Sequence, residues 1–237
     1  MRRKSKISIL YKDEDILVCE KPKGMPSVSD KTSDMDLLHQ LKNTLFFEEN
    51  RSEEPELYVV HRLDRPVSGV MVFARNQHAA SMLSEQIREH RFEKDYQAVL
   101  TGWLPQDEGT FRDYLLKEAR SNVSKVVPEG TPGAKEAVLD YEVIDMVETD
   151  QGQYTYCLIH LQTGRHHQIR VQTSARGCGI WGDTKYNKKF QKTKHQYKEI
   201  GLCATRIAFF HPTTNEKMEF KVEPKGEAFD LLELTDE

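Results

Sequence analysis

An acidic residue between two arginines is the clearest chemical signal in this sequence. Asp64 lies between Arg62 and Arg65 within residues 61–69, a segment that also holds a proline and a glycine and runs into an apolar stretch. The proline and the glycine predict a shaped turn. The two guanidinium groups should favour the ionised form of Asp64, which could then act as a nucleophile or a base. A surface ion-pair turn has the same composition, so this segment alone leaves a structural interpretation open.

A second candidate is the strand-like segment of residues 92–98. Alternation along a strand places Lys94 and Tyr96 on one face and the acids Glu93 and Asp95 on the other. An aromatic ring beside a cation suits a nucleobase and its phosphate, because stacking on such a ring contributes about 1–3 kcal/mol. A tyrosine in a strand is more often simply packed in the sheet, and that alternative also stays open.

A third candidate begins at Gly164 and opens a helix expected over residues 165–175. The N–H groups at a helix start attract phosphate, and the planar fork of Arg165 could bind a carboxylate or a phosphate. Zinc at His166 and His167 is disfavoured. Adjacent helical side chains point about 100° apart, the H-E-x-x-H pattern is absent, and no cysteine lies close in sequence.

Size and composition indicate an ordinary globular protein. The chain has 237 residues, 38% hydrophobic and 30% charged, which allows a sizeable core without disulfide or metal crosslinks. Its four cysteines include no C-x-x-C pair, so reduced thiols and a cytoplasmic location are expected. No run is apolar and long enough for a signal peptide or a membrane span.

The charges are unevenly distributed along the chain. The net charge is −4, but residues 160–198 hold nine arginines and lysines against one acid, whereas residues 48–56 hold five glutamates and one arginine. Such segregation suits a protein with one side that faces phosphate groups. A solvated, lysine-rich loop at residues 185–198 is the alternative explanation.

Periodicity and turn residues predict an α+β architecture. Asn76 is expected to cap the second of three helices, and the helices are expected at residues 36–45, 77–90 and 165–175. Strands are expected at residues 7–11, 16–20, 69–74, 92–100, 138–147, 154–161, 204–210 and 217–222. Because strands outnumber helices and often follow one another directly, we expect a large, mostly antiparallel mixed sheet flanked by helices, in preference to a doubly wound parallel sheet.

Taken in order, the three chemical segments resemble the RluA-type family of pseudouridine synthases, which convert uridine in RNA to its C5-glycoside isomer. The matching motifs are His61-Arg62-Leu63-Asp64-Arg65 with Ser68-Gly69, Lys94-x-Tyr96, and Gly164-Arg165-x-His167-Gln168-Ile169-Arg170-Val171. Weaker similarities extend over most of the chain, at Lys21-Pro22-x-Gly24-x-Pro26, Gly182-Asp183-x-x-Tyr186 and Leu202-x-Ala204 through His211-Pro212. Val67 and Cys203 stand where the family usually has threonine and histidine, and neither change removes a reacting group.

The resemblance implies one pseudouridine synthase catalytic domain over residues 1–237 with a central active-site cleft. Residues 1–6 would be a flexible basic arm, and the S4-type RNA-binding domain of many members is not expected. Asp64 would start cleavage of the C1′–N1 bond of a flipped uridine, either by attack on the sugar or by removal of a sugar proton. Tyr96 would stack beneath the uracil and take the proton from C5, and Arg165 would pair with Asp64.

The remaining implied contacts concern RNA. Arg62 would help to displace the flipped nucleotide, and Lys94, Gln168 and Arg170 would also bind the rRNA or tRNA stem-loop. Ile169 and Leu202 would wall the pocket and exclude water, although ordinary core packing explains them as well. The reaction needs no cofactor and no metal. No obligatory protein partner is expected, and a monomer is the default.

Two other classes of protein share some of these sequence features. An RNA-binding or assembly protein could keep this fold without catalysis, but the retained Asp64, Tyr96 and Arg165 argue against that. A glycoside hydrolase normally needs two carboxyl groups that flank the scissile bond, and no second acid stands out beside Asp64. Free uracil as the product would favour the hydrolase.

Overall fold

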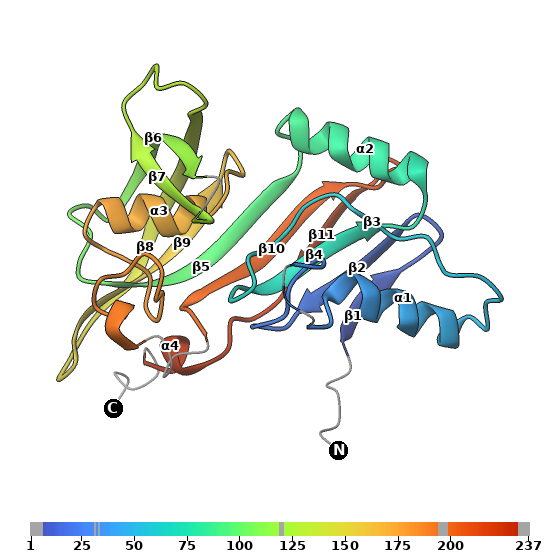
Figure 1. The fold of residues 1–237 in the computed structure, drawn as a ribbon, viewed down its shortest axis with the longest axis horizontal. Coiled ribbons are helices and arrows are strands. Elements are labelled where there is room, and N and C mark those ends of the chain that lie inside the picture. Colours follow the sequence, from blue (N-terminus) through green and yellow to red (C-terminus); the bar gives the residue numbers. More distant parts are fainter. Residues whose placement is uncertain (1–6, 31, 33, 119–120, 194–198, 232–237) are drawn as a thin grey trace. The chain divides into compact units, whose positions relative to one another are not determined.

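The computed structural model describes residues 7–30, 32, 34–118, 121–193 and 199–231. The chain divides into two compact units, of which the first comprises residues 1–93 and 204–222 and the second residues 94–203 and 223–237. Figure 1 shows the chain coloured along its sequence. The basic arm expected at residues 1–6 lies outside the described residues. Both units are thus discontinuous in sequence: residues 94–203 of the second lie between the two parts of the first, and residues 223–237 follow them.

The first unit has the strand order β1-β2-β4-β10, in which β1 to β2 and β2 to β4 are antiparallel; β3 pairs antiparallel with β4, and β11 with β10. Its strands are β1 (Ser8–Lys12), β2 (Ile16–Lys21), β3 (Tyr58–Val59), β4 (Ser68–Ala74), β10 (Leu202–Phe210, of which residues from 204 onward belong to this unit) and β11 (Lys217–Lys221). Its helices are α1 (Leu37–Glu48) and α2 (Gln77–Arg88).

Side-chain caps fix where both helices of the first unit begin. The carboxylate of Asp36 accepts the N–H of His39 at 3.0 Å at the start of α1. The side-chain oxygen of Asn76 accepts the N–H of Ala79 at 2.8 Å at the start of α2, so the cap expected from the sequence is confirmed. These bonds satisfy N–H groups that have no partner within the helix itself.

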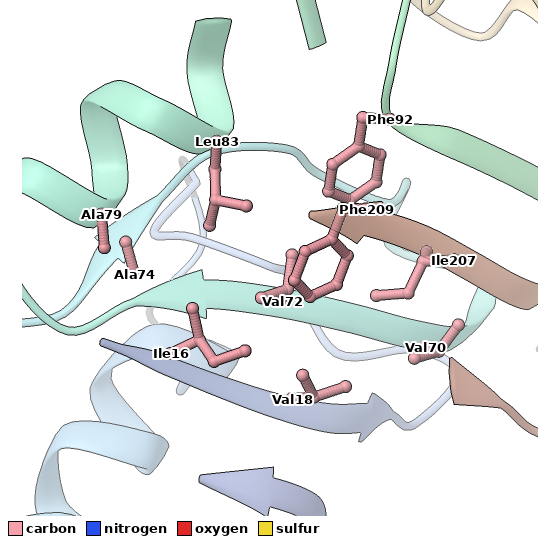
Figure 2. Close-up of a cluster of buried hydrophobic side chains, with 10 residues drawn as sticks. All are labelled: Ile16, Val18, Val70, Val72, Ala74, Ala79, Leu83, Phe92, Ile207 and Phe209. Atoms are coloured by element: carbon pink, nitrogen blue, oxygen red, sulfur yellow. The ribbon is translucent and has the colours of Figure 1, made fainter. Parts of the chain in front are cut away.

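The core of the first unit lies between α2 and the sheet. Figure 2 shows Val70 and Val72 of β4, Leu83 of α2 and Phe209 within one cluster of buried side chains. The rings of Phe209 and Phe92 stack with their centroids 5.4 Å apart. The residues that alternate with these two valines along β4 are also fully buried. Both faces of β4 are therefore covered, which explains why it reads as a continuous apolar run in the sequence.

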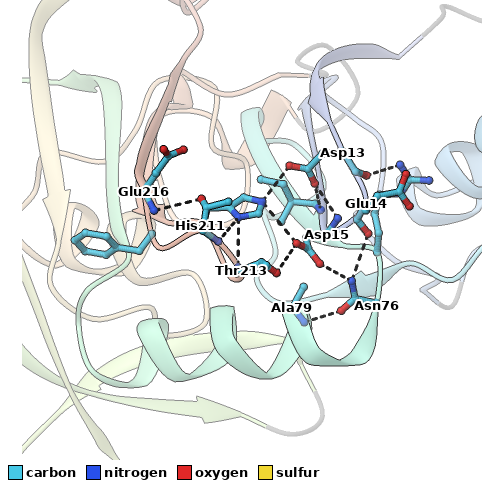
Figure 3. Close-up of polar contacts among 12 residues, drawn as sticks. Asp13, Glu14, Asp15, Asn76, Ala79, His211, Thr213 and Glu216 are labelled. Atoms are coloured by element: carbon cyan, nitrogen blue, oxygen red, sulfur yellow. Dashed lines mark hydrogen bonds and ion pairs between the residues drawn. The ribbon is translucent and has the colours of Figure 1, made fainter.

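A polar network around His211 joins three turns of the first unit (Figure 3). The Nε2 atom of His211, after β10, lies 3.0 Å from a carboxylate oxygen of Asp13 in the β1–β2 turn. Asp15 in the same turn accepts hydrogen bonds from the Thr213 hydroxyl at 2.6 Å and from the Asn76 amide at 2.7 Å. The His211-Pro212 similarity noted in the sequence thus falls on a structural junction.

The second unit has the strand order β10-β5-β9-β8-β6-β7, in which β5 to β9, β9 to β8, β8 to β6 and β6 to β7 are antiparallel. Its strands are β5 (Glu93–Thr101, from residue 94 onward), β6 (Glu108–Glu118), β7 (Val123–Val127), β8 (Lys135–Thr149), β9 (Gly152–Leu161) and residues 202–203 of β10. Its helices are α3 (Gln168–Ala175), η1 (Gln191–Thr193) and α4 (Glu227–Asp230). Val171 of α3 packs with Leu115 and Ala137 of the sheet.

The described residues confirm an α+β fold with a large, mostly antiparallel sheet, since eleven strands take part in its order. The hairpin of β6 and β7 was missed from the sequence, and α3 begins at residue 168 rather than at residue 165. The single catalytic domain stays a prediction. No helix in the described part of the chain has the length and apolar character needed to cross a membrane.

Candidate active site

The loop that carries Asp64 lies between β3 and β4 and is held by its backbone. The carbonyl of Asp64 accepts the N–H of Val67 at 3.0 Å, which closes the expected turn. The buried Ser27 hydroxyl donates to the carbonyl of Leu63 at 2.8 Å and accepts the N–H of the same residue at 3.2 Å. Both backbone groups of the residue before Asp64 are therefore fixed by one side chain. Nothing in the sequence pattern pointed to Ser27.

A buried lysine supports the other side of this loop. Lys21 is 0% exposed, and its ammonium group donates to the carbonyls of Pro22 at 3.0 Å, Met25 at 2.7 Å and Arg65 at 3.2 Å. The N–H of Gly24 donates to the same Arg65 carbonyl at 2.9 Å. A buried charge needs such partners, because without them its loss of hydration would not be offset. The Lys21–Pro26 similarity to the family therefore falls on a support for the Asp64 turn.

The two arginines that flank Asp64 do not play equivalent roles. The guanidinium group of Arg65 forms ion pairs with Asp34 and, at 3.5 Å, with Asp30, and donates to the carbonyl of Gly24 at 3.1 Å. The expectation that both arginines stabilise the charge of Asp64 stays a prediction. Arg62 is exposed, and Asp64 is partly buried.

Tyr96 and Lys94 lie in β5, where Tyr96 is opposite Ile159 of β9. The side chain of Tyr96 is 7% exposed. Asp95 points to the other face of the strand, and its carboxylate lies 2.6 Å from the Nδ1 atom of His160. The alternation expected at this segment is thus present, with Lys94 and Tyr96 on the same face.

The second unit brings the tyrosine and arginine motifs together at Lys94 and Gly164. A Cβ atom placed on Gly164 would lie only 3.2 Å from the Nζ atom of Lys94, so the lysine side chain rests against the residue that precedes Arg165. Burial lowers the pKa of Lys94 below its usual value of 10.5. The absence of a side chain at Gly164 leaves the space that this ammonium group needs.

Arg165 lies in the loop before α3, and two hydrogen bonds set its position. Its backbone N–H donates to the side-chain oxygen of Gln168 at 2.9 Å, and its Nε atom donates to the carbonyl of Glu136 in β8 at 2.7 Å. The expected phosphate site at a helix start therefore does not include Arg165, because the helix begins three residues later. A guanidinium group held through Nε still has its two terminal nitrogens available for a planar acceptor.

A model of the family described as RNA pseudouridylate synthase matches residues 15–175 of this chain. The chain belongs to this family. It is of the RluA type, and it is a pseudouridine synthase. The tRNA pseudouridine synthase C of Vibrio parahaemolyticus is 32% identical over 230 residues, which cover 91% of this chain and 89% of that protein. The ribosomal large subunit pseudouridine synthase C of Salmonella typhimurium is 31% identical over 221 residues, covering 90% of this chain and 65% of that protein.

The fold of this pseudouridine synthase is shared by solved structures. The structure titled Human RNA Pseudouridylate Synthase Domain Containing 4 matches with a TM-score of 0.77 and 21% sequence identity, covering 95% of this chain and 92% of that one. A likeness at this identity concerns the fold. The α+β architecture expected from the sequence therefore agrees with that of known pseudouridylate synthase domains.

Two of the residues expected to contact RNA are buried and bonded to other parts of this synthase. Arg170 is 5% exposed, and its guanidinium group forms a bidentate ion pair with Asp183, with both contacts at 2.8 Å. Gln168 is 3% exposed and bonds to the Thr163 hydroxyl at 2.8 Å and the Val138 carbonyl at 3.1 Å. Both side chains stabilise the region that carries Arg165, and neither is exposed for RNA. Periodicity alone cannot separate an arginine that binds RNA from one with a buried partner.

The roles assigned to the other site residues stay predictions. Ile169 is 4% exposed and Leu202 is 3% exposed, as expected both of a pocket wall and of ordinary core residues. Asp64 and Arg62 lie in the first unit. Tyr96, Lys94 and Arg165 lie in the second.

The two histidines of the arginine motif of this synthase have hydrogen-bond partners. The Nδ1 atom of His166 lies 2.8 Å from the Ser124 hydroxyl, and the Nδ1 atom of His167 lies 2.6 Å from the Tyr186 hydroxyl. Within the described ranges, histidine, cysteine, aspartate and glutamate side chains form no group of three or more that could hold a metal ion.

Proposed function

We propose that this synthase isomerises one or more specific uridines in a folded tRNA or rRNA. Family membership supports the chemistry, and its similarity to a tRNA pseudouridine synthase and to a ribosomal large subunit pseudouridine synthase supports the class of RNA. Recognition of folded RNA rests on shape and on single-stranded loops. An unpaired uridine in a loop is the preferred target, because extruding a nucleotide that is already unstacked costs less free energy.

Asp64 starts the reaction. The carboxylate attacks the sugar or removes a proton from it, and the C1′–N1 bond of the flipped uridine breaks. The freed uracil turns and rejoins C1′ through C5. As this bond forms, the bond between Asp64 and the sugar breaks, or the removed sugar proton is returned. The proton on C5 is then lost, and N1 gains a proton. The atoms of the nucleotide are conserved, so the step needs no group donor, no oxidant and no cofactor.

Tyr96 and Arg165 complete the catalytic set. Tyr96 stacks beneath the uracil and takes the proton from C5, and the terminal nitrogens of Arg165 pair with the carboxylate of Asp64. The observation that carries this assignment is the contact of Lys94 with Gly164, because it unites the tyrosine motif with the arginine motif in the second unit. Lys94 binds the phosphate of the extruded nucleotide, and Arg62 fills its place in the RNA.

A dry pocket is required, since water that reached the cleaved intermediate would convert the isomerase into a glycosidase. We assign Ile169 and Leu202 to the wall of a central active-site cleft. The chain acts as one catalytic domain and as a monomer in the cytoplasm, where its RNA substrates are found, without an obligatory protein partner.

The Asp64→Asn variant tests the chemistry, and Asp150→Asn is its control, since Asp150 is an exposed carboxylate in the β8–β9 turn. The readout is tritium release from RNA that contains 5-tritiated uridine. Asp64→Asn should abolish release while RNA binding survives, and Asp150→Asn should keep wild-type release. Full activity in Asp64→Asn would refute the role of Asp64. Free uracil as the product would identify a glycosidase, and binding without release by the wild-type protein would identify an RNA-binding protein.

Pseudouridine mapping in cells with and without the gene identifies the RNA. We expect one or a few sites in tRNA or rRNA to disappear when the gene is removed and to return with the wild-type gene but not with Asp64→Asn. An unchanged map would contradict the proposal.

A further inference from the structure

We propose that Tyr186 is a positioning residue for pseudouridine formation, because its hydroxyl group holds the turn that presents Arg165. This inference rests on the role proposed for Arg165. Tyr186 lies beyond residues 15–175, the part of the chain that matches the family model. All of the residues concerned belong to the second unit.

The turn after Arg165 has an unfavourable backbone conformation. His167 has φ 55° and ψ 28°, which is the left-handed region, and it caps α3 without a hydrogen bond from its own side chain to the helix. Residues with a Cβ atom disfavour this region. The bond from the N–H of Val171 to the carbonyl of His167, at 3.0 Å, starts the helix but does not by itself set the left-handed residue. A contact of the His167 side chain therefore helps to hold this conformation.

The hydroxyl group of Tyr186 supplies that contact. It lies 2.6 Å from the Nδ1 atom of His167 and accepts the backbone N–H of Ser124 in β7 at 2.8 Å. The two rings also meet edge to face, with their centroids 5.5 Å apart. Burial, with the nearby Arg170 as the next largest cause, lowers the pKa of His167 to about 2, so the imidazole stays neutral and this bond persists at physiological pH. One hydroxyl thus joins the Arg165 turn to the β6–β7 hairpin.

Tyr186 is itself fixed to α3, so it cannot simply follow a displaced His167. Asp183 binds Arg170 through two contacts and also accepts the N–H of Lys185 at 2.9 Å. The hydroxyl of Ser174 donates to the carbonyl of Tyr186 at 2.7 Å. The segment Gly182-Asp183-x-x-Tyr186 is therefore a brace between the middle of α3 and the turn before it.

The first experiment replaces Tyr186 with phenylalanine and compares it with Tyr156→Phe. Tyr156 is a matched control, because its hydroxyl donates a part-buried bond of 2.6 Å to Gln97 in the same unit without touching the Arg165 turn. Tyr186→Phe should lower kcat roughly ten- to hundredfold while KM for RNA stays within about twofold, because small misplacements of a catalytic group have effects of this size. Tyr156→Phe should leave kcat within about twofold. Equal kcat values for the two variants would overturn the inference.

A second experiment tests the backbone explanation by a change at His167. Glycine adopts positive φ readily, so His167→Gly removes the need for the Tyr186 hydroxyl. His167→Gly alone should stay active, and Tyr186→Phe added to it should change kcat by less than about twofold. The inference is overturned if His167→Gly is inactive, or if Tyr186→Phe lowers kcat as much in this background as in the wild type.

Arg165→Ala separates this inference from the proposed function. A wild-type kcat in Arg165→Ala would show that Arg165 has no catalytic role. Tyr186 would then have no catalytic group to position. A loss of activity in Arg165→Ala together with a wild-type Tyr186→Phe would overturn only the role of Tyr186. Loss of activity in Arg165→Ala and in Tyr186→Phe, with little effect of Tyr186→Phe in the His167→Gly background, supports the roles of both Arg165 and Tyr186.

Discussion

The ammonium group of Lys21 in β2 donates a hydrogen bond of 3.2 Å to the backbone carbonyl of Arg65, the residue that follows Asp64. A fully buried cation therefore connects a turn near the beginning of the chain to the loop assigned to catalysis. Because the acceptors are backbone carbonyls, the contact fixes the path of the main chain and leaves the carboxylate itself for chemistry.

Replacing this lysine should loosen the Asp64 loop. Lys21→Met keeps the length of the side chain but removes the ammonium group that donates to the carbonyls of Pro22, Met25 and Arg65, so we expect a loss of about 1–3 kcal/mol in the free energy of unfolding and lower kcat in the folded protein. Urea unfolding and tritium release measure the two effects. The control is Lys23→Met at an exposed position, which should change stability by less than about 0.5 kcal/mol. A variant at Lys21 as stable as wild type would contradict this account.

Gly69 should tolerate no side chain. It has φ +130°, and a Cβ atom there would lie 2.2 Å from the carbonyl oxygen of Ala204 in β10. Gly69→Ala must therefore push β4 away from β10 and should destabilise the protein by several kcal/mol, above the roughly 1–2 kcal/mol expected for positive φ alone. Gly130→Ala is the control, since its φ is +80° and nothing lies within 4 Å. Equal melting temperatures for the two variants would show that the close approach is unimportant.

The stability of the first unit should depend on pH through Asp15. Hydrogen bonds from Thr213 and Asn76 lower the pKa of Asp15 below its usual 3.8, against the opposing effect of burial. For Asp13, burial acts to raise the pKa, but bonds from the Ile16 N–H and the Tyr11 hydroxyl lower it overall. Because the unfolded chain binds more protons, this stabilisation is complete above pH 3.8 and is lost as the pH falls through the lowered pKa.

The measurement is urea unfolding at a series of pH values from neutral to strongly acidic. Asp15→Asn should be less stable than wild type at neutral pH and should show a shallower fall in unfolding free energy in acid. Asp150→Asn, at an exposed turn, should reproduce the wild-type slope. An unchanged slope in Asp15→Asn would mean that the network in Figure 3 does not hold the carboxylate in its charged form.

The Arg170–Asp183 pair should be structural. The two side chains are 6% and 1% exposed, so Asp183→Asn leaves a buried arginine without its counterion and should cost about 3–5 kcal/mol. Glu118→Gln breaks the exposed pair with Lys125 and should cost about 0–1 kcal/mol. RNA affinity of the folded Asp183→Asn protein should match wild type. Weaker RNA binding by Arg170→Lys than by Asp183→Asn, at equal stability, would instead restore Arg170 to the RNA surface.

The sequence predicted the elements whose signals are local. Asn76 was recognised as a cap because the polar cap and the apolar spacing of the following helix lie within a few residues. The hairpin of β6 (Glu108–Glu118) and β7 (Val123–Val127) was missed, since buried residues alternate with polar ones only irregularly along β6. The start of α3 was placed three residues early, because the left-handed His167 has no signature in side-chain type.

Among site residues, the type of side chain was easier to predict than its partner. Asp64, Tyr96 and Arg165 lie in local sequence motifs, whereas the residues that support their loops are distant in sequence, such as Ser27, which bonds to Leu63 36 residues away. Arg170 and Gln168 have the composition of RNA contacts, but their burial depends on Asp183 and Val138, which periodicity does not connect to α3. Which residue a side chain bonds to depends on the tertiary structure, so these partners cannot be identified from the sequence alone.

The first unit is discontinuous in sequence, and this constrains how it folds during synthesis on the ribosome. Its core includes Ile207 and Phe209, and His211 bonds to Asp13 across 198 residues. A nascent chain that ends at residue 201 contains residues 94–201 of the second unit. It still lacks the β10 residues that complete the core of the first unit. During synthesis, the strands before residue 93 and their two helices therefore stay incompletely packed until residues 207–211 have left the ribosome.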